Sequence, residues 1–486
     1  MQNSIKNLLL LPLLIAALGL ISAAQVTAQV FSIVHIFAGS PNDGENPLAG
    51  VIVSGSTLYG AADDAGAYGY GAVYAVNVNG SGYTNLYSFT DGNDGGYPDG
   101  TLVLSGGILY GTANQAGKYN NGVVFSISTN GTGFTNLYSF TGGNDGAAPN
   151  DTLLLSGNTL YGTTRSGGST GYGVVFKVNT NGVGFTNLYN FTNGTDGAQP
   201  HGLVISGNTL YGPTLGGSVF RINTDGTGFT NLHSLTTASY SVAALGPGSS
   251  APNFTNSDGV AATSLILSGN TLYGTTFFGG ANGNGTVFAV NTDGTGFTNL
   301  HNFAFSRTNT SGLYTNSDGA HPYERGLILS GNTLYGTAAL GGTNGNGTIF
   351  EINTNGTGFT VLHTFAAGTG SFPHNYTNSD GAEPFGAALI LSANILYGTA
   401  KSGGSNGFGT VFALGLPLPP SVGIATSGNK TILSWPTNAA SFTLQSITNL
   451  TSGSWSNVTS GITTVGTNYT LTNTVNGNAL FFRLKH

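Results

Sequence analysis

Apolar and polar residues alternate in short runs along this chain, and the same succession of runs returns seven times. In one unit, the runs 265–268 (LILS) and 271–274 (TLYG) flank a Gly-Asn pair, which is typical of a tight β-hairpin turn. The runs 285–291 (GTVFAVN) and 297–303 (FTNLHNF) follow, joined by a short loop. No run has the 3.6-residue period of a helix. Each unit is therefore predicted to form four strands, here named A, B, C and D in chain order.

The letters LYG in strand B mark each unit. Their tyrosines are Tyr59, Tyr110, Tyr161, Tyr211, Tyr273, Tyr335 and Tyr397. The spacings are 51, 51, 50, 62, 62 and 62 residues, and a fixed period of this size is typical of propellers and related arrays. Seven four-stranded units predict an all-β fold, namely a seven-bladed β-propeller.

The two ends of the array predict how the propeller closes. The array begins with a lone D strand at 31–37 (FSIVHIF), and the last unit stops after strand C at 411–414 (VFAL). Pairing the first strand with the last unit would complete a ring by strand exchange. An open β-solenoid is the alternative, but it would have atypical polar repeats at its ends. We therefore expect a closed propeller over residues 29–414.

The segments outside the array indicate export and a second domain. Residues 1–28 have a positive start, an apolar run and a small-residue cleavage site, as a secretory signal peptide does. An uncleaved membrane anchor is the alternative, although the apolar run is shorter than the roughly 20 residues that a span needs. A Pro-rich linker is expected at 415–420, and alternating runs at 421–486 predict a small β-sandwich of the fibronectin type III-like kind.

Composition narrows the function further. Charged residues make up 6% of the chain, against about 25% in an average soluble protein. The net charge of −7 and the lack of a basic cluster argue against nucleic acid as a partner. Cysteine is absent, so stability does not come from disulfides. We expect a monomeric bacterial protein, secreted or held at the cell surface, with no membrane span after signal cleavage and no cofactor.

The repeated letters follow the pattern DGxxP…LYGTTxxGGxxGxGTVF…LxxF over residues 30–414. This pattern resembles the GloVer tandem repeat of exported bacterial proteins, and the resemblance implies export and a repeat architecture but no established activity. The Gly-Gly pair after strand B is also similar to kelch repeats, although strand D lacks the kelch tryptophan. The C-terminal pattern SWP…LQ…W…FFRL resembles modules common at the C-termini of secreted bacterial proteins.

Loop lengths indicate which face of the propeller binds a ligand. The B–C and D–A connections are long and lie on one face, and loops on a rigid scaffold usually hold the function. Three D–A connections carry insertions at 236–257, 304–317 and 366–379. We expect them to form an aromatic, Asn-rich wall that suits sugar rings; covering blade edges or packing on the C-terminal domain is the alternative. The candidate ligand-binding residues in this wall are Tyr240, Phe254, Arg307, Tyr314, Phe372, His374 and Tyr376.

Arg165 and Lys401 are further candidates, because they place charges in B–C loops where other repeats have uncharged residues. Asp63, Asp64 and Lys118 do the same, and solvated surface charge is the alternative for all of them. The aspartates of the repeated Asp-Gly pairs could hold calcium, but a hydrogen-bonded turn is the favoured interpretation. Four histidines and three tyrosines share one position of strand D, where we expect a hydrogen-bonding aromatic between blades rather than a metal ligand.

Catalytic motifs are nearly absent. Residues 167–171 and 403–407 match G-x-S-x-G, but this motif needs a strand-to-helix elbow and here lies in glycine-rich loops. The sequence predicts no catalytic, cofactor or metal residue, although two carboxylates across the central opening could support glycosidase or lyase chemistry. The favoured function is non-catalytic binding of a glycan or matrix polymer. The alternatives are a structural or protein-interaction module of the cell envelope and a polysaccharide-active hydrolase or lyase.

Overall fold

The structure is a computed structural model of the 486-residue chain. It describes residues 29–236, 239–241, 253–309, 313–323, 326–370, 376–385, 388–417, 422–437, 442–448, 454–474 and 480–485. The predicted signal peptide, 1–28, lies outside these ranges. The chain divides into a larger unit, Phe31–Leu414, and a smaller unit that includes Gly415–His486. All elements of the described residues are strands, which confirms the all-β prediction. No helix in these ranges has the length and apolarity needed to cross a membrane.

Seven four-stranded sheets make up most of the described part of the larger unit, and each contains the predicted strands A to D. Sheet 1 has β3 (Ile52–Ser54), β4 (Thr57–Ala62), β6 (Ala72–Asn77) and β7 (Thr84–Ser88). Sheet 2 has β8 (Val103–Ser105), β9 (Ile108–Ala113), β10 (Val123–Ser128) and β11 (Thr135–Ser139). Sheet 3 has β12 (Leu154–Ser156), β13 (Thr159–Thr164), β14 (Val174–Asn179) and β15 (Thr186–Asn190). Sheet 4 has β16 (Val204–Ser206), β17 (Thr209–Pro213), β18 (Ser218–Asn223) and β19 (Thr230–Ser234).

The remaining sheets follow the same plan. Sheet 5 has β22 (Val260–Ser268), β23 (Thr271–Phe278), β24 (Thr286–Asn291) and β25 (Thr298–Asn302). Sheet 6 has β28 (Leu327–Ser330), β29 (Thr333–Ala338), β30 (Thr348–Asn353) and β31 (Thr360–Thr364). Sheet 7 has β32 (Ile390–Ser392), β33 (Ile395–Ala400), β34 (Thr410–Gly415) and, as its fourth strand, β1 (Val30–Ile36). Short pairs in the connections are β2 (Gly44–Glu45) with β5 (Asp64–Ala65), β20 (Ser239–Ser241) with β21 (Asn253–Thr255), and β26 (Arg307–Thr308) with β27 (Tyr314–Thr315).

The glycine of LYG has a steric role in every sheet. In sheet 5, Gly274 of β23 pairs with Phe288 of β24, and a Cβ on this glycine would lie 2.4 Å from the Phe288 ring. The corresponding glycines of the other sheets meet a Phe, or Tyr74 in sheet 1, at a similarly close approach. Phe288 is fully buried. The glycine therefore recurs because the aromatic ring of strand C occupies the space that its side chain would take.

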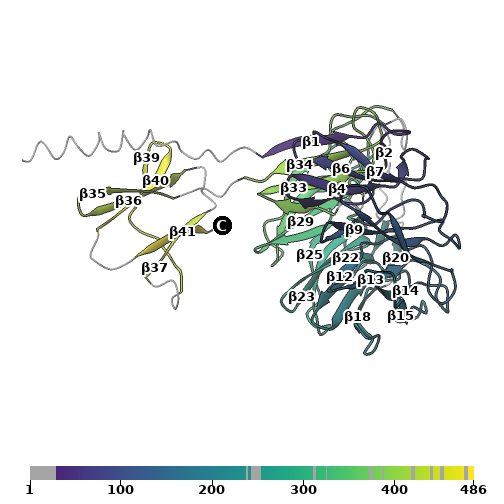
Figure 1. The fold of residues 1–486 in the computed structure, drawn as a ribbon. Helices are drawn as coiled ribbons and strands as arrows, with labels where there is room; N and C mark the ends of the chain where they lie inside the picture. Colours follow the sequence, from purple (N-terminus) through teal and green to yellow (C-terminus); the bar gives the residue numbers. More distant parts are fainter. Residues whose placement is uncertain are drawn as a thin grey trace, which may run out of the picture. The chain divides into compact units, whose positions relative to one another are not determined.

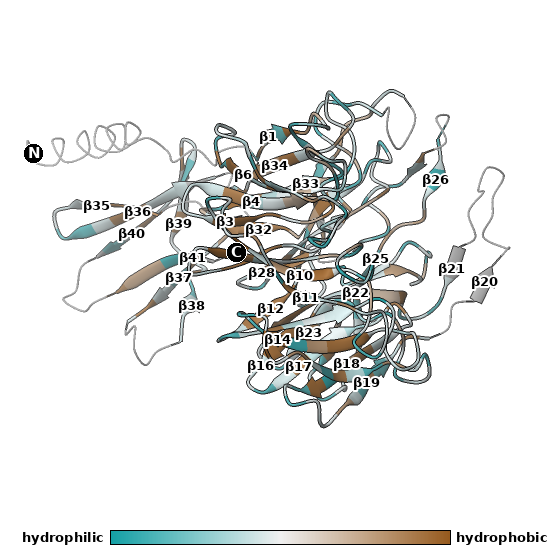
Figure 2. Ribbon diagram, turned by 45° about the vertical axis from the view of Figure 1, so that its right-hand side comes forward, coloured by the Kyte–Doolittle hydropathy of each residue, from teal (hydrophilic) through white to brown (hydrophobic). Residues whose placement is uncertain are grey.

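Buried apolar clusters join neighbouring sheets, and Figure 2 shows that apolar residues follow the strands while polar residues collect in turns and loops. The tyrosine of LYG belongs to these clusters, as Tyr273 does where sheet 5 packs on Phe350 of sheet 6. Each LYG hairpin thus presents the same aromatic surface to the sheet that follows.

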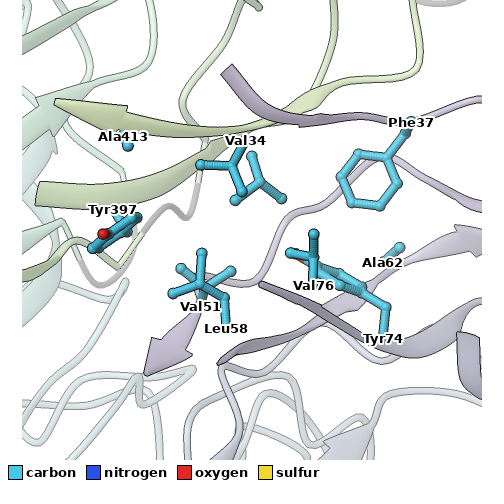
Figure 3. Close-up of a cluster of buried hydrophobic side chains, with 10 residues drawn as sticks. Val34, Phe37, Val51, Leu58, Ala62, Tyr74, Val76, Tyr397 and Ala413 are labelled. Atoms are coloured by element: carbon cyan, nitrogen blue, oxygen red, sulfur yellow. The ribbon is translucent and has the colours of Figure 1, made fainter. Parts of the chain in front are cut away.

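Strand β1 brings the two ends of the larger unit together, and Figure 1 shows it beside β34. Phe37, which directly follows β1, packs in one buried cluster with Tyr74 of sheet 1 and Tyr397 of sheet 7 (Figure 3). Phe31 of β1 also stacks on His363 of sheet 6, with ring centroids 3.8 Å apart. Sheet 7 therefore contacts both sheet 1 and sheet 6.

The smaller unit is a two-sheet β-structure. One sheet has the order β35 (Gly423–Ser427), β36 (Lys430–Pro436), β40 (Asn468–Thr474) and β39 (Ile462–Val465), and the other β38 (Ser456–Asn457), β37 (Thr443–Ile447) and β41 (Phe481–Lys485). Leu433 and Trp435 of the first sheet share a buried core with Leu444 of the second. The two layers thus enclose one small core.

Candidate functional site

The D–A and B–C connections lie together, as the loop lengths predicted. Each D–A connection pairs with the B–C loop of the sheet into which it leads. Examples are the bridges of Gly96 with Gln115, Ala147 with Ser166, and Ala382 with Ser402. We call this surface, formed by the D–A and B–C connections, the loop face.

Each Asp-Gly aspartate of the loop face is fixed by the strand D before it. Its carboxylate bonds to the histidine or tyrosine at the shared position of strand D over 2.8 to 3.2 Å, and it accepts a bond from a backbone N–H just after that strand, as from Thr141. The seven pairs are His35–Asp43, Tyr87–Asp94, Tyr138–Asp145, Tyr189–Asp196, His233–Asp258, His301–Asp318 and His363–Asp380.

The same histidine or tyrosine ring also stacks on an aromatic ring of the next strand D. Tyr138 lies on Phe185 with centroids 3.8 Å apart and planes 5° from parallel, and His301 lies on Phe359 at 3.7 Å. These contacts are those of a hydrogen-bonding aromatic between neighbouring units, as expected. Protein donors occupy the Asp-Gly carboxylates, which agrees with the turn interpretation. No group of three or more His, Asp or Glu side chains in the described ranges could hold a metal ion.

Two positions of the loop face keep the same backbone but change their side chain from sheet to sheet. The first precedes the proline of the D–A connection and has a positive φ of 53° to 58°. The second position is three residues after the LYG glycine. Its backbone N–H donates a hydrogen bond to the carbonyl oxygen of the first position. The pairs are Asn46 with Asp63, Tyr97 with Asn114, Ala148 with Arg165, Gln199 with Leu215, His321 with Ala339, and Glu383 with Lys401.

Aromatic side chains from three successive sheets meet on the loop face. Phe277, near the end of β23 in sheet 5, lies edge-on to Tyr323 with centroids 4.8 Å apart. Tyr323, before sheet 6, stacks on Phe385, before sheet 7, at 4.1 Å. The Lys401 ammonium lies 5.4 Å from the centre of the Phe385 ring, a distance at which a cation is attracted to the ring face. All four side chains are partly exposed.

Carboxylates continue this row of side chains into sheets 1 and 2. Burial, together with the negative charges of Asp99 and Asp64, raises the pKa of Asp63 to about 8, while Lys401 acts in the opposite direction. Asp63 Oδ1 is buried, with no hydrogen-bond partner among the described residues. The Asp63 carboxyl group therefore keeps its proton to a higher pH than an ordinary aspartate does. The loop-face arc, defined as Phe277, Tyr323, Phe385, Lys401, Asp63 and Asp99, runs from sheet 5 through sheet 7 to sheet 2.

The predicted wall of insertions divides into separate elements. Tyr240 and Phe254 lie opposite each other in the β20–β21 pair, but their side chains are outside the described part. Phe372 and His374 also lie outside the described residues. Arg307 is exposed and Tyr314 partly exposed, on the neighbouring strands β26 and β27.

Tyr376 differs from the expectation of a surface aromatic, because its side chain is only 3% exposed. Its hydroxyl accepts hydrogen bonds from Gly368 N at 2.8 Å and from Asn346 Nδ2 at 2.5 Å. This ring fills the interior of its own connection and is not available to a ligand. Of the two charged candidates in B–C loops, Arg165 is exposed in sheet 3, whereas Lys401 belongs to the loop-face arc.

Sequence reasoning missed Phe277, Tyr323, Phe385 and Asp99 as candidate site residues. A signal for them was present, because each occupies a position at which the other repeats carry different residue types. Phe277 is the third residue after an LYG glycine, and the other three follow the D–A proline. Only the fold shows that these two positions are adjacent.

These features place the chain in the class of all-β tandem-repeat proteins with a propeller-like fold. The chain belongs to the Gloeobacter/Verrucomicrobia repeat family, whose model matches residues 16–217, 117–251 and 217–417. No curated protein matches the sequence.

Solved structures with similar strand arrangements include two enzymes named as oligogalacturonate lyases. One, in complex with manganese, is 12% identical over 82% of this chain and 95% of its own, with a TM-score of 0.48. The other, from Vibrio parahaemolyticus, is 8% identical over 81% and 95%, with a TM-score of 0.44. A putative 6-phosphogluconolactonase from Bacteroides fragilis is 14% identical over 95% and 100%, with a TM-score of 0.40.

Proposed function

We propose that this protein is exported, forms a closed seven-bladed β-propeller followed by a fibronectin type III-like β-sandwich, and binds a glycan or matrix polymer without catalysis. Export is supported by the signal-peptide pattern of residues 1–28. Closure is supported by β1 as the fourth strand of sheet 7 and by the hydrogen bond from Asn46 N to Phe408 O, which links sheets 1 and 7. The protein acts at the cell surface or outside the cell.

The loop-face arc is the observation that carries the binding proposal. Strand packing and the Asp-Gly turns repeat from sheet to sheet, whereas the arc joins side chains that differ between repeats. Phe277, Tyr323 and Phe385 are partly exposed, so a ligand can reach their rings. Ligand sites are typically built in this way, from aromatic surface with a few placed polar groups.

The chemistry of the arc suits a saccharide better than a polyanion or a protein partner. Aromatic faces pack on the C–H faces of sugar rings, and Asp63 and Asp99 offer oxygen atoms to hydroxyl groups. Lys401 supplies one positive charge next to these acids, so the arc has no excess of basic charge. These residues form a partly exposed aromatic surface with polar groups beside it.

Binding is tested by retention of the mature full-length protein on a panel of immobilised polysaccharides. Tyr323→Ala and Phe385→Ala should each raise the dissociation constant at least about tenfold, which corresponds to about 1.4 kcal/mol of binding free energy. Val183→Ser is the matched control, because Val183 is 65% exposed in the C–D turn at the other end of sheet 3. Failure of the wild-type protein to bind any glycan, or equal binding by all variants, would overturn the proposal.

A polysaccharide-active enzyme is the second candidate, and Asp63 is the observation that favours it. A carboxylic acid whose pKa is raised, as that of Asp63 is, can donate a proton to a leaving group, and a neighbouring carboxylate such as Asp99 can assist. The test is release of reducing ends or unsaturated products from any polysaccharide that the protein retains. Activity that is lost in Asp63→Asn while binding persists would establish catalysis, and absence of product would exclude it for those substrates.

A further inference from the structure

In four sheets, the side chain at one position of the B–C loop makes a hydrogen bond that holds the loop in place. This side chain donates the hydrogen bond to the carbonyl oxygen of the phenylalanine that directly follows strand D. The donors and acceptors are Thr170 with Phe191, Asn282 with Phe303, Asn344 with Phe365, and Asn406 with Phe37. The bond ties the loop to the outer strand of its sheet.

Sheets 1 and 2 replace this short polar residue with a tyrosine. Tyr68 is 62% exposed and Tyr119 is 46% exposed, so their rings extend into water. These two neighbouring repeats have therefore exchanged a structural side chain for an accessible aromatic ring at the same position.

Each of these tyrosines lines an open pocket of the same construction. The pocket at Tyr68 has a volume of about 460 Å³ and the pocket at Tyr119 about 560 Å³. Residues of strand D line both pockets, together with Tyr68 in the first and Tyr119 in the second. The equivalent lining residues are Asn85, Leu86, Tyr87 and Ser88 in sheet 1, and Asn136, Leu137, Tyr138 and Ser139 in sheet 2.

The residues that line these two pockets indicate which class of ligand would bind there. An aromatic face, a leucine, and the amide and hydroxyl groups of Asn and Ser match the mixed apolar and hydroxyl surface of a sugar residue. Among the residues that the structure describes, no charged side chain lines the pocket at Tyr68. Lys118 is the one charged residue among the described lining of the pocket at Tyr119, and its ammonium lies 5.0 Å from the centre of that tyrosine ring. The pockets therefore favour an uncharged saccharide.

We propose that the two pockets are paired subsites for one uncharged polysaccharide chain, distinct from the loop-face arc. Two equivalent pockets one repeat apart suit a polymer whose own units repeat, because occupation of one pocket raises the effective concentration of the chain at the other. A short oligosaccharide fills one pocket and binds weakly. A chain long enough to reach both binds more tightly without any new type of contact.

The test replaces each tyrosine by the residue that sheets 5 to 7 use there. Tyr68→Asn and Tyr119→Asn should remove the aromatic face while permitting the structural hydrogen bond, so melting temperatures should stay equal or rise. Each single variant should weaken binding of a long neutral polysaccharide by about 10- to 100-fold, and the double variant should bind it no better than a disaccharide. Tyr172→Asn is the control, because Tyr172 is 39% exposed at a different loop position of sheet 3.

The readouts separate this proposal from that for the loop-face arc. Tyr323→Ala and Phe385→Ala should leave the dependence of affinity on chain length intact, whereas the Tyr68 and Tyr119 variants should abolish it. Equal affinity of the double variant and the wild-type protein for every retained polysaccharide would overturn the paired subsites. So would affinity that does not increase with chain length, or no retention on any neutral polysaccharide.

Discussion

Asp145 offers the sharpest test of how the loop face is held. Its carboxylate accepts hydrogen bonds from Tyr138 Oη at 2.9 Å, Thr141 N at 2.9 Å and Thr141 Oγ at 2.5 Å. Asp145→Ala removes all three and leaves the Thr141 N–H without its acceptor. Tyr138→Phe removes only one and keeps the stacked ring.

The magnitudes follow from the bonds lost. A hydrogen bond to a charged group contributes about 1.5–3 kcal/mol and an orphaned donor costs about 1–3 kcal/mol. Asp145 is partly exposed, so solvent screening reduces each contribution below these ranges. We expect Asp145→Ala to lower the free energy of unfolding by about 2–4 kcal/mol and Tyr138→Phe by about 1 kcal/mol. The double variant should cost about 1 kcal/mol less than the sum of the two, because both remove the same bond.

Urea denaturation followed by circular dichroism measures these differences, and amide hydrogen exchange at Thr141 reports the lost acceptor directly. The reasoning fails if Asp145→Ala costs no more than Tyr138→Phe, or if exchange at Thr141 stays slow. A chelator provides the second control. Destabilisation of the wild-type protein by EDTA, absent in Asp145→Ala, would mean that the carboxylate holds a cation instead of the turn.

Three further predictions concern packing, ionisation and closure. Gly274→Ala should lower stability by about 1–3 kcal/mol through overpacking against Phe288, and Phe288→Leu should restore part of the loss in thermal melts. The pKa of Asp63 is raised in the folded state to about 8, so the stability that the Asp63 carboxyl group contributes is present below about pH 4 and is lost as the pH rises through 8. The melting temperature of Asp63→Asn, relative to that of the wild-type protein, should therefore increase between these two pH values. A difference that stays constant with pH would contradict the raised pKa. Phe37→Ala should cost about 3–5 kcal/mol, as much as Phe140→Ala, since both side chains are fully buried; a much smaller loss at Phe37 would show that β1 is not an integral strand.

The strands could be predicted well from the sequence because the same pattern of residues recurs in all seven repeats. The LYG hairpin, the lone first strand and the shared D-strand aromatic are all local signals. The bond between that aromatic and the Asp-Gly aspartate was not predicted, although both recur in every unit. Insertions hide the relation, since Tyr138 and Asp145 are 7 residues apart but His301 and Asp318 are 17 apart.

The candidate site was predicted less well, because it depends on residues that only the fold brings together. Phe277, Tyr323 and Phe385 come from three units, and no local pattern states that their rings touch. Tyr376 shows the opposite error. An aromatic residue in a long polar loop reads as a surface group, yet this connection folds back over Asn346 and buries the ring. Burial inside a loop depends on the path of the loop, which residue types alone do not specify.

The hydrogen bond between the residue before the D–A proline and the third residue after the LYG glycine has an evolutionary consequence. Main-chain atoms alone form it, so it tolerates Asn with Asp, Ala with Arg, or Glu with Lys. Where these side chains reach the surface, as at Asp63, Arg165 and Lys401, they can change without loss of this hydrogen bond. Duplication of a repeat then supplies a further pair of positions joined by the same main-chain bond, at which exposed side chains can change while the fold of the unit is kept.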